Sequence, residues 1–302
     1  MAYQNPLHGL TLAQIRSGGA VHLAVKLAGG LLDVPETAKL LKLPAPSTMD
    51  ELLAGARGAE VQALVKAANG SAQVQLLPEA SAQFAPVVSR PEKILCVGLN
   101  YKAHVAEAGN RPLPTAPVLF GKYNNALNSH GATLKLPTGV AHKFDYEVEL
   151  VAVIGRRAEN VSEADALDYV AGYATGNDFT ARELQQGNGG QWLLGKSLNG
   201  SAPVGPYLVS ADQVDPTNLA LECRVNGETR QSSNTAQMIF PVRQVVSFAS
   251  RYMTLEPGDL IFTGTPEGVI LGYEKEKQVW LKAGDEIACS VGTLGELRFR
   301  LA

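Results

Sequence analysis

Residues 142–155 read HKFDYEVELVAVIG, in which three acidic side chains at alternate positions lead into an apolar run. In a β-strand successive side chains point to opposite faces, so Asp145, Glu147 and Glu149 would share one face. Carboxylates two positions apart stand about 7 Å from each other at their Cα atoms and can converge on one cation. Like charges on one face repel one another unless a positive group lies among them. A solvated face is the alternative, but such faces normally mix both signs, so the stretch favours a metal-binding strand.

The chain around this strand indicates a mainly β region. From residue 93 onward, short apolar runs that suit strands are separated by Gly and Pro residues. The Asn-Gly pair at 226–227 suits the type I′ turn of a hairpin. Only two segments predict convincing helices: 162–170, with Ser162 as its cap, and 240–253. Strands and helices do not alternate as in a Rossmann fold, so we predict an α+β, mainly β architecture.

The N-terminal part of the chain is richer in Ala and Leu. It predicts a hairpin with its turn at Gly29–Gly30. Residues 48–69 predict one helix, capped by Ser47 or Thr48. The Pro-containing stretch 77–92 suits a linker. The expected domains are a small α/β domain over residues 1–90 and a catalytic domain over residues 91–302.

The composition excludes several classes of protein. The 302 residues carry a formal net charge of −3 without any Lys/Arg-rich block, which argues against nucleic acid and anionic membranes as partners. No apolar run has the length needed to span a bilayer, and the first residues lack the pattern of a secretory signal. Cys96, Cys223 and Cys289 are far apart and odd in number. They predict buried, reduced thiols in a cytoplasmic protein, with no disulfide framework and no zinc site.

A further acidic residue, Asp178, ends another apolar run and precedes a predicted helical turn. It would therefore lie where a strand reaches the rim of a pocket. With no cysteine nearby, its hard oxygen atoms would suit Mg²⁺ or Mn²⁺, which leave coordination positions for water and substrate. A plain helix N-cap is the alternative, and for Asp178 taken alone it is the commoner role.

Residues 98–110, GLNYKAHVAEAGN, place His104 three positions before Glu107. One helical turn would bring the two side chains to the same face. A carboxylate beside an imidazole orients the ring and raises its basicity, as a general base requires. A surface His–Glu pair is the alternative, and spacing alone favours it. The flanking Gly98 and Gly109 are consistent with a segment that moves as a lid.

Three signals are weaker. Lys196 follows an apolar stretch, where an ammonium group would neutralise an anionic substrate, although a lone lysine is usually solvated. Residues 187–190, GNGG, lack the spacing of a phosphate loop and suit a flexible connection. Residues 263–265, TGT, end a predicted strand with hydroxyl and backbone N–H groups that would hold a carboxylate.

Taken together, ordered motifs over about residues 90–302 resemble the fumarylacetoacetate hydrolase superfamily. These motifs are NYKAHVAE, FDYEVEL, GNDFTARELQ, GKSLNGSAPVGP, RVNGETRQSSNTAQMIF, YMTLEPGDLIFTGTPEGV and LKAGDEI. The resemblance implies a twisted, largely β roll that is often dimeric and is preceded in many members by a smaller N-terminal domain. We therefore expect a homodimer.

The resemblance also implies roles for individual residues. The implied metal ligands are Glu147, Glu149 and Asp178, the catalytic groups are His104, Glu107 and Lys196, and the substrate contacts are Arg182, Gln185 and Thr265. The chain departs from the family pattern at Asn199, where many members have an acid. It departs again at residues 122–128, KYNNALN, which replace a Lys-Pro form. Both departures are expected to reshape the substrate end of the pocket.

The implied substrate is a small 2-oxo acid, which chelates the metal through its carboxylate and 2-oxo oxygen. The metal would act as a Lewis acid and stabilise the enolate. Hydrolysis of a 2,4-dioxo acid of the acylpyruvate or fumarylpyruvate type is the first expectation, with His104 and Glu107 activating water. Oxaloacetate decarboxylation and 2-hydroxyhepta-2,4-diene-1,7-dioate isomerisation are the alternatives. A metal-stabilised, non-catalytic binding or scaffold protein is an alternative of another class, against which the base and Lys196 argue.

Overall fold

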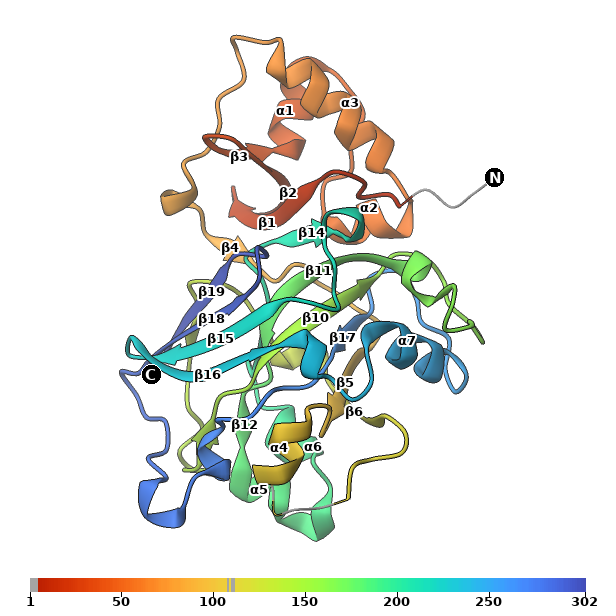
Figure 1. Cartoon of the computed structure of the whole chain (residues 1–302). Coiled ribbons are helices and arrows are strands. Elements are labelled where there is room, and N and C mark those ends of the chain that lie inside the picture. Colours follow the sequence, from red (N-terminus) through yellow and green to blue (C-terminus); the bar gives the residue numbers. More distant parts are fainter. Residues whose placement is uncertain (1–4, 108, 110–111) are drawn as a thin grey trace.

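The computed structural model of this chain describes residues 5–107, 109 and 112–302. Two β-sheets form the centre of the molecule, and short helices lie around them (Figure 1). The N-terminal segment lies at one end, and helices α4, α5 and α6 gather at the opposite end. These helices are α4 (Lys102–Glu107), α5 (Arg182–Gln186) and α6 (Leu193–Lys196). The predicted α+β, mainly β class is confirmed.

The larger sheet has the strand order β3-β2-β1-β14-β11-β10-β17-β5-β6, with β4 paired to β1. Its strands are β1 (Thr11–Ser17), β2 (Ala20–Leu27), β3 (Gly30–Asp33), β4 (Phe84–Ala85), β5 (Ile94–Gly98), β6 (Val118–Lys122), β10 (Val148–Ile154), β11 (Val170–Asn177), β14 (Leu208–Ser210) and β17 (Leu260–Phe262). All residues of β10 and β11 are buried. Strands covered on both faces read as continuous apolar runs, which explains the sequence of β10.

The strand predicted through the acidic stretch is interrupted just before β10. The short strand β9 (Phe144–Asp145) pairs instead with β12 (Thr180–Ala181). The Asp145 carboxylate accepts hydrogen bonds from three backbone N–H groups, those of Tyr146, Ile270 and Leu271. Asp145 shares the Arg182 guanidinium with Glu147, but it is not one of the three clustered acids.

The second sheet has the order β16-β15-β18-β19-β8 and packs against β10 and β11. Its strands are β8 (Thr133–Leu134), β15 (Ala220–Val225), β16 (Glu228–Asn234), β18 (Glu286–Val291) and β19 (Glu296–Leu301). Asn226 and Gly227 join β15 to β16 with φ angles of 52° and 83°, as the predicted type I′ turn requires. Cys223 and Cys289 lie opposite each other on β15 and β18. Both thiols and that of Cys96 are buried and free, as expected.

The N-terminal segment extends the larger sheet. Strand β1 pairs antiparallel with β14, and the predicted hairpin joins β2 to β3. Its helices are α1 (Val34–Leu41), α2 (Met49–Ala54) and α3 (Gly58–Asn69). Leu12 of β1 shares one hydrophobic cluster with Val151 and Phe262 of the central strands. The division of the chain near residue 90 stays a prediction.

The single helix expected over 48–69 is wrong in its extent, because the chain turns between α2 and α3. There Ala56 has a φ angle of 48°, a left-handed conformation that a right-handed helix does not contain. Gly55 ends α2. Thr48 caps α2 as predicted, since its hydroxyl accepts a hydrogen bond from the Glu51 N–H at 3.2 Å.

The two helices predicted in the catalytic region differ in outcome. Residues 162–170 form a turn followed by a 3₁₀-helix over Ala166–Tyr169, so the predicted α-helix is wrong. The Ser162 hydroxyl accepts a hydrogen bond from the Asp165 N–H at 3.2 Å, which closes a turn instead of starting a helix. The helix predicted over 240–253 is α7 (Val242–Ser250).

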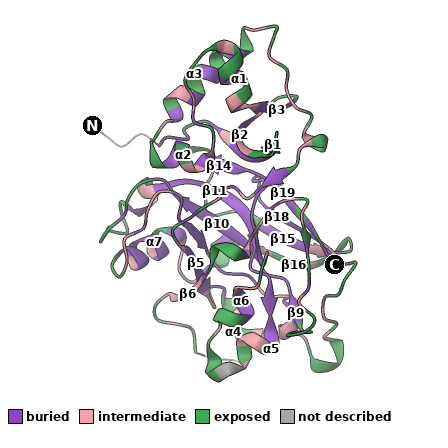
Figure 2. Cartoon of the chain, turned by 180° about the vertical axis from the view of Figure 1, so that it is seen from behind, coloured by how far each residue is buried: buried purple, intermediate pink, exposed green. Residues whose placement is uncertain are grey.

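Burial follows the sheets. Figure 2 shows buried residues concentrated along the strands, with exposed residues on the outer helices and loops. Among the described residues, every helix is too short or too polar to cross a bilayer. The acidic end of β10 points toward α4, α5 and α6, and the predicted site residues gather there.

Candidate active site

Glu147, Glu149 and Asp178 come together at adjoining ends of β10 and β11. The antiparallel register places Val148 opposite Asn177. The Asp178 backbone N–H then donates a hydrogen bond to the Glu147 carbonyl at 2.9 Å. One oxygen from each of the three carboxylates lies within 4.8 Å of the others, and all three residues are buried. The fold therefore brings together the three acids predicted as metal ligands.

Three buried cations surround this cluster. Lys196 Nζ lies 2.7 Å from both Glu147 Oε2 and Asp178 Oδ2. Lys122 Nζ lies 2.6 Å from Asp178 Oδ1, and Arg182 Nη1 lies 2.8 Å from Glu147 Oε1. Buried charges are tolerated only when they are paired in this way. Lys196 was predicted to act here, whereas Lys122 was not.

Glu149 is the acid whose charge is least balanced. Burial, together with the charges of Asp178 and Glu147, raises the pKa of Glu149 well above its ordinary value. Burial also opposes the charge of Glu147, but Lys196 and Arg182 outweigh it and lower the pKa of Glu147. Without a further cation, the cluster therefore favours the protonated form of Glu149.

The donor set fits a hard divalent cation. Carboxylates supply only oxygen ligands, which Mg²⁺ and Mn²⁺ prefer. Glu149 Oε2 accepts a hydrogen bond from the Gly264 N–H at 2.7 Å. Its other oxygen has no donor in the part of the chain that is described. A cation beside Glu149 would supply the positive charge that its raised pKa shows to be lacking.

The raised pKa of Glu149 predicts a pH dependence of stability in the metal-free protein. The folded state keeps this proton above about pH 4.3, where the unfolded chain has lost it. The stability contributed by the protonated form is therefore lost as pH rises from that value through the raised pKa. In EDTA, we expect Tm to fall more with rising pH in the native protein than in Glu149→Gln. Parallel Tm curves for the two proteins would contradict this.

His104 and Glu107 form the predicted pair on α4. His104 Nδ1 lies 2.7 Å from Glu107 Oε1, and Glu107 Oε2 accepts a hydrogen bond from the Gly268 N–H at 3.0 Å. An ionised carboxylate only accepts hydrogen bonds, so Nδ1 carries the proton and Nε2 is the basic nitrogen of the neutral ring. A Cβ on Gly272 would lie 2.5 Å from the Glu107 carboxyl group. The backbone at Gly272 therefore packs directly against Glu107.

A cavity of about 690 Å³ joins these groups. The predicted site residues that line it are His104, Glu107, Glu147, Glu149, Arg182, Gln185, Lys196 and Thr265. Its volume is within the range of about 300–1,000 Å³ that is usual for small-molecule sites. Its described lining runs from Val97 to Leu271, so it includes no described residue of the N-terminal segment. Gly98 and Gly109 also line it, while residue 108 of the predicted lid lies outside the described residues.

Arg182 is held at the cavity and keeps one nitrogen unpaired. Its Nε lies 2.7 Å from Asp145 Oδ2, and its Nη1 lies 2.9 Å from Gln185 Oε1. Its Nη2 is buried without a hydrogen-bond partner among the described residues. Because a buried, unpaired donor is costly, this nitrogen suits an oxygen-bearing ligand such as a carboxylate.

The Thr-Gly-Thr strand end differs from the prediction. The Thr263 hydroxyl donates to the Leu150 carbonyl at 2.8 Å, and the Thr265 hydroxyl donates to the Val148 carbonyl at 2.9 Å. The Thr265 hydroxyl also accepts a hydrogen bond from Gln231 Nε2 at 2.9 Å. Both hydroxyls thus tie this segment to β10, so neither is a free donor for a substrate carboxylate. The substrate contact of Thr265 stays a prediction.

The two departures from the family pattern contact each other. Asn125 Nδ2 donates to Asn199 Oδ1 at 2.8 Å and to the Ser197 carbonyl at 3.0 Å. Neither asparagine belongs to the described lining of the large cavity. The expectation that these departures reshape its substrate end is therefore not supported.

Among the site residues that were not predicted from the sequence, three have charged or aromatic side chains. Lys122 contacts Asp178, and Phe120 and Trp192 line the cavity. Phe120 and Lys122 are two positions apart on β6, so strand alternation puts both on one face. Trp192 precedes α6, which carries Lys196. The alternation on β6 could have predicted that Phe120 and Lys122 share a face. For Trp192, the sequence offers only its closeness to Lys196.

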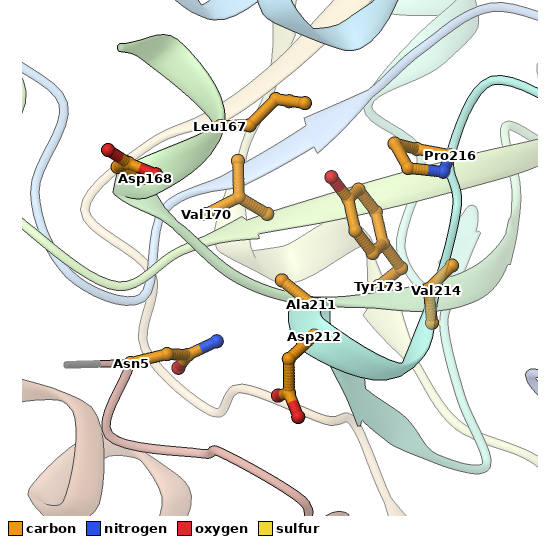
Figure 3. A pocket seen from close by; sticks show the side chains of 9 residues that line it. All are labelled: Asn5, Leu167, Asp168, Val170, Tyr173, Ala211, Asp212, Val214 and Pro216. Atoms are coloured by element: carbon orange, nitrogen blue, oxygen red, sulfur yellow. The ribbon is translucent and has the colours of Figure 1, made fainter.

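A smaller cavity of about 280 Å³ lies where the N-terminal segment meets β11 (Figure 3). Asn5, Asp168 and Asp212 are among its polar lining residues. Asp212 already accepts a hydrogen bond from the Gly9 N–H and lies 2.9 Å from the His8 ring. The nine lining residues shown include no cation, so this cavity does not suit an anionic acid.

Comparison with known proteins places this geometry in context. Residues 93–302 match the family model described as fumarylacetoacetate (FAA) hydrolase, C-terminal. The chain is 41% identical to oxaloacetate tautomerase FAHD2A, mitochondrial, from Bos taurus over 269 residues, 88% of this chain and 82% of that protein. The structure of fumarylacetoacetate hydrolase from psychrophilic Exiguobacterium antarcticum has a TM-score of 0.81 and 30% identity, covering 97% of this chain and 99% of that one. Fumarylpyruvate hydrolase from Pseudomonas aeruginosa, in complex with Mn²⁺ and pyruvate, has a TM-score of 0.64 and 37% identity, covering 73% and 91%.

Proposed function

This chain belongs to the fumarylacetoacetate hydrolase family, and from that premise we propose that it interconverts the keto and enol forms of oxaloacetate. One observation carries the proposal: a base, a buried ammonium group and two of the three clustered carboxylates, Glu147 and Glu149, border a single cavity. The name of the bovine relative supports oxaloacetate chemistry over the acylpyruvate hydrolysis that the sequence favoured. Oxaloacetate decarboxylation is the accompanying reaction, because loss of CO₂ from C3 of the keto form gives the enolate of pyruvate, which the same groups would stabilise.

Glu147, Glu149 and Asp178 would hold the cation. A bound Mg²⁺ or Mn²⁺ would supply Lewis-acid polarisation of the 2-oxo group. The lack of a balancing cation beside Glu149 supports this role, as does the Mn²⁺ in the related fumarylpyruvate hydrolase. The choice between the two ions is open in this proposal.

His104 would move the proton. With Nδ1 held by Glu107 at 2.7 Å, Nε2 can accept the proton from C3 of the keto acid. The C3–H bond then breaks, the C2–C3 double bond forms, and the proton held on Nε2 passes to the C2 oxygen to give the enol. The reverse sequence returns the keto form, so no proton is gained or lost overall. A positioned base of this kind contributes roughly 10²–10⁴-fold to rate.

Lys196 and Arg182 would hold the acid. Burial opposes the charge of Lys196, but Asp178 and Glu147 outweigh it and raise its pKa, so it stays an ammonium group. It would stabilise the negative charge that develops on the C2 oxygen. The unpaired Nη2 of Arg182 would bind the far carboxylate of the diacid.

The test follows oxaloacetate and acetylpyruvate separately with EDTA-treated protein, before and after addition of Mn²⁺. We expect Mn²⁺ to restore acceleration of enol-to-keto conversion, followed through the ultraviolet absorbance of the enol. Pyruvate formed from oxaloacetate reports decarboxylation, and loss of acetylpyruvate reports hydrolysis. If the Mn²⁺-loaded protein accelerates none of the three reactions, the proposal fails and a scaffold role is favoured.

Acylpyruvate hydrolysis is the second candidate. It is favoured by the likeness to fumarylpyruvate hydrolase and by a cavity of about 690 Å³, more than a short diacid fills. In that reaction His104 would activate water for attack on the C4 carbonyl. The isomerase reaction ranks third. A homodimer, a separate N-terminal domain and a cytoplasmic location belong to the proposal as well, and light scattering of the purified protein tests the first.

A further inference from the structure

One wall of the large cavity plays no part in the proposed oxaloacetate reaction. Phe120 and Trp192 line it, with ring centroids 5.3 Å apart and ring planes at 75°. This edge-to-face geometry is a favourable one for an aromatic pair. Lys196 Nζ lies 5.4 Å from the Phe120 ring centroid and 2.7 Å from Glu147 Oε2. The aromatic wall therefore begins beside the cation that contacts the acidic cluster.

The local sequence makes room for the Trp192 ring. A Cβ on Gly98 would lie 2.4 Å from Cζ3 of Trp192, so only glycine lets the ring rest on this end of β5. In the sequence, Gly189 and Gly190 come shortly before Trp192, and their φ angles are 70° and 80°. The Trp192 carbonyl accepts the Lys196 N–H at 3.1 Å. The Trp192 ring therefore packs against the end of β5, and one helical turn connects Trp192 to Lys196.

The lining of the cavity combines two kinds of chemistry. Arg182 and Gln185 supply charge and hydrogen-bonding capacity, and Arg182 Nη2 has no partner among the described residues. Phe120 and Trp192 supply apolar surface, because the Phe120 ring carries no polar atom and Trp192 has a single N–H. A short diacid would use the polar groups only.

We propose that Phe120 and Trp192 form an apolar subsite for the alkyl or aryl substituent of a 2-oxo acid. This inference rests on the proposed function, because the carboxyl and 2-oxo end of the acid is taken to be held by the acidic cluster and Lys196. The substituent beyond C3 then passes Lys196 and reaches the Phe120 ring. The chain accordingly binds 2-oxo acids with an apolar tail as well as short diacids.

Binding of two matched acids tests the subsite. The probes are 2-oxobutanoate and 2-oxo-4-phenylbutanoate, which differ by a phenyl group, bound to the Mn²⁺-loaded protein and measured by calorimetry. Burial of the ring between aromatic side chains should tighten binding by roughly tenfold to a hundredfold. Trp192→Ala should reduce this ratio to a few-fold, whereas Trp192→Phe should keep most of it. Tyr252→Ala, which removes an aromatic side chain that is 68% exposed, is the matched control and should leave the ratio unchanged.

A fluorescence measurement checks the same contact without replacing Trp192. The chain has two tryptophans, so Trp280→Phe leaves Trp192 as the sole reporter. We expect 2-oxo-4-phenylbutanoate to change its emission more than oxalate does at saturation. If both acids bind with equal affinity and leave the emission equally unchanged, the subsite is refuted while the proposed function stands. If 2-oxobutanoate, 2-oxo-4-phenylbutanoate and oxalate all fail to bind, the subsite and the proposed function are both refuted.

Discussion

Replacement of Glu147 by Gln is expected to abolish Mn²⁺ binding and every 2-oxo-acid reaction. The Glu147 carboxylate contacts Arg182 Nη1 at 2.8 Å and Lys196 Nζ at 2.7 Å. The amide removes a ligand charge and leaves two buried cations without part of their compensation. Groups that only support a metal ligand change affinity by roughly 10–100-fold, so loss of a ligand itself should exceed that range. Calorimetric titration with Mn²⁺ and oxaloacetate tautomerisation at fixed Mn²⁺ measure the two effects.

The matched control is Glu274→Gln. Glu274 lies 2.8 Å from Lys277, and both side chains are 72% exposed, so this change removes the same charge far from any buried cation. It should leave Mn²⁺ affinity and activity unchanged. A circular dichroism spectrum and Tm of Glu147→Gln separate loss of the site from loss of the fold. If the folded variant binds Mn²⁺ as tightly as the native protein, Glu147 is not a ligand.

Local pattern brought two of the three clustered acids together but could not place the third beside them. Glu147 and Glu149 are two positions apart, so strand periodicity pairs them without any tertiary information. Asp178 joins them because β11 pairs antiparallel with β10 in one register, with Asn177 opposite Val148. A slip of one residue would turn the β11 side chains to the other face. The register is fixed because both strands are buried. A short stretch of sequence taken alone does not reveal which strand it will pair with.

The structure adds partners that the sequence could not show. The Asp145 carboxylate accepts hydrogen bonds from the N–H groups of Ile270 and Leu271, more than a hundred positions away, and shares Arg182 with Glu147. Asn125 and Asn199, which depart separately from the family pattern, are hydrogen-bonded to each other. Each of these contacts joins residues that are distant in sequence.

In the N-terminal segment, the amino-acid composition and the sheet topology point to different boundaries. Its Ala- and Leu-rich composition suggested a separate unit, and the predicted hairpin and helix cap are present. Yet Thr11 of β1 pairs with Val209 of β14, so both parts of the chain share one sheet. Figure 1 places this segment at the end of the molecule opposite α4, α5 and α6. No described residue of this segment lines the cavity.

Replacement of His104 by Ala is expected to divide the reactions of oxaloacetate. Tautomerisation requires transfer of the C3 proton, so its rate should fall by roughly 10²–10⁴-fold, the usual effect of losing a general base. Decarboxylation breaks a carbon–carbon bond and removes no proton from C3, so it should fall much less. Mn²⁺ affinity should change little, because His104 contacts Glu107 and not the acidic cluster. Both rates are measured at saturating Mn²⁺ on the same preparation.

His142→Ala is the matched control, because His142 is exposed and absent from the described lining of the cavity. It should leave both rates unchanged. Glu107→Gln keeps a hydrogen-bond acceptor for Nδ1 but removes the charge that orients the ring and raises its basicity. It should therefore slow tautomerisation by less than His104→Ala does. Equal losses of tautomerisation and decarboxylation in His104→Ala would show that the pair serves a step common to both, such as closure of α4 over the cavity. The assignment of Nε2 as the proton acceptor would then be wrong.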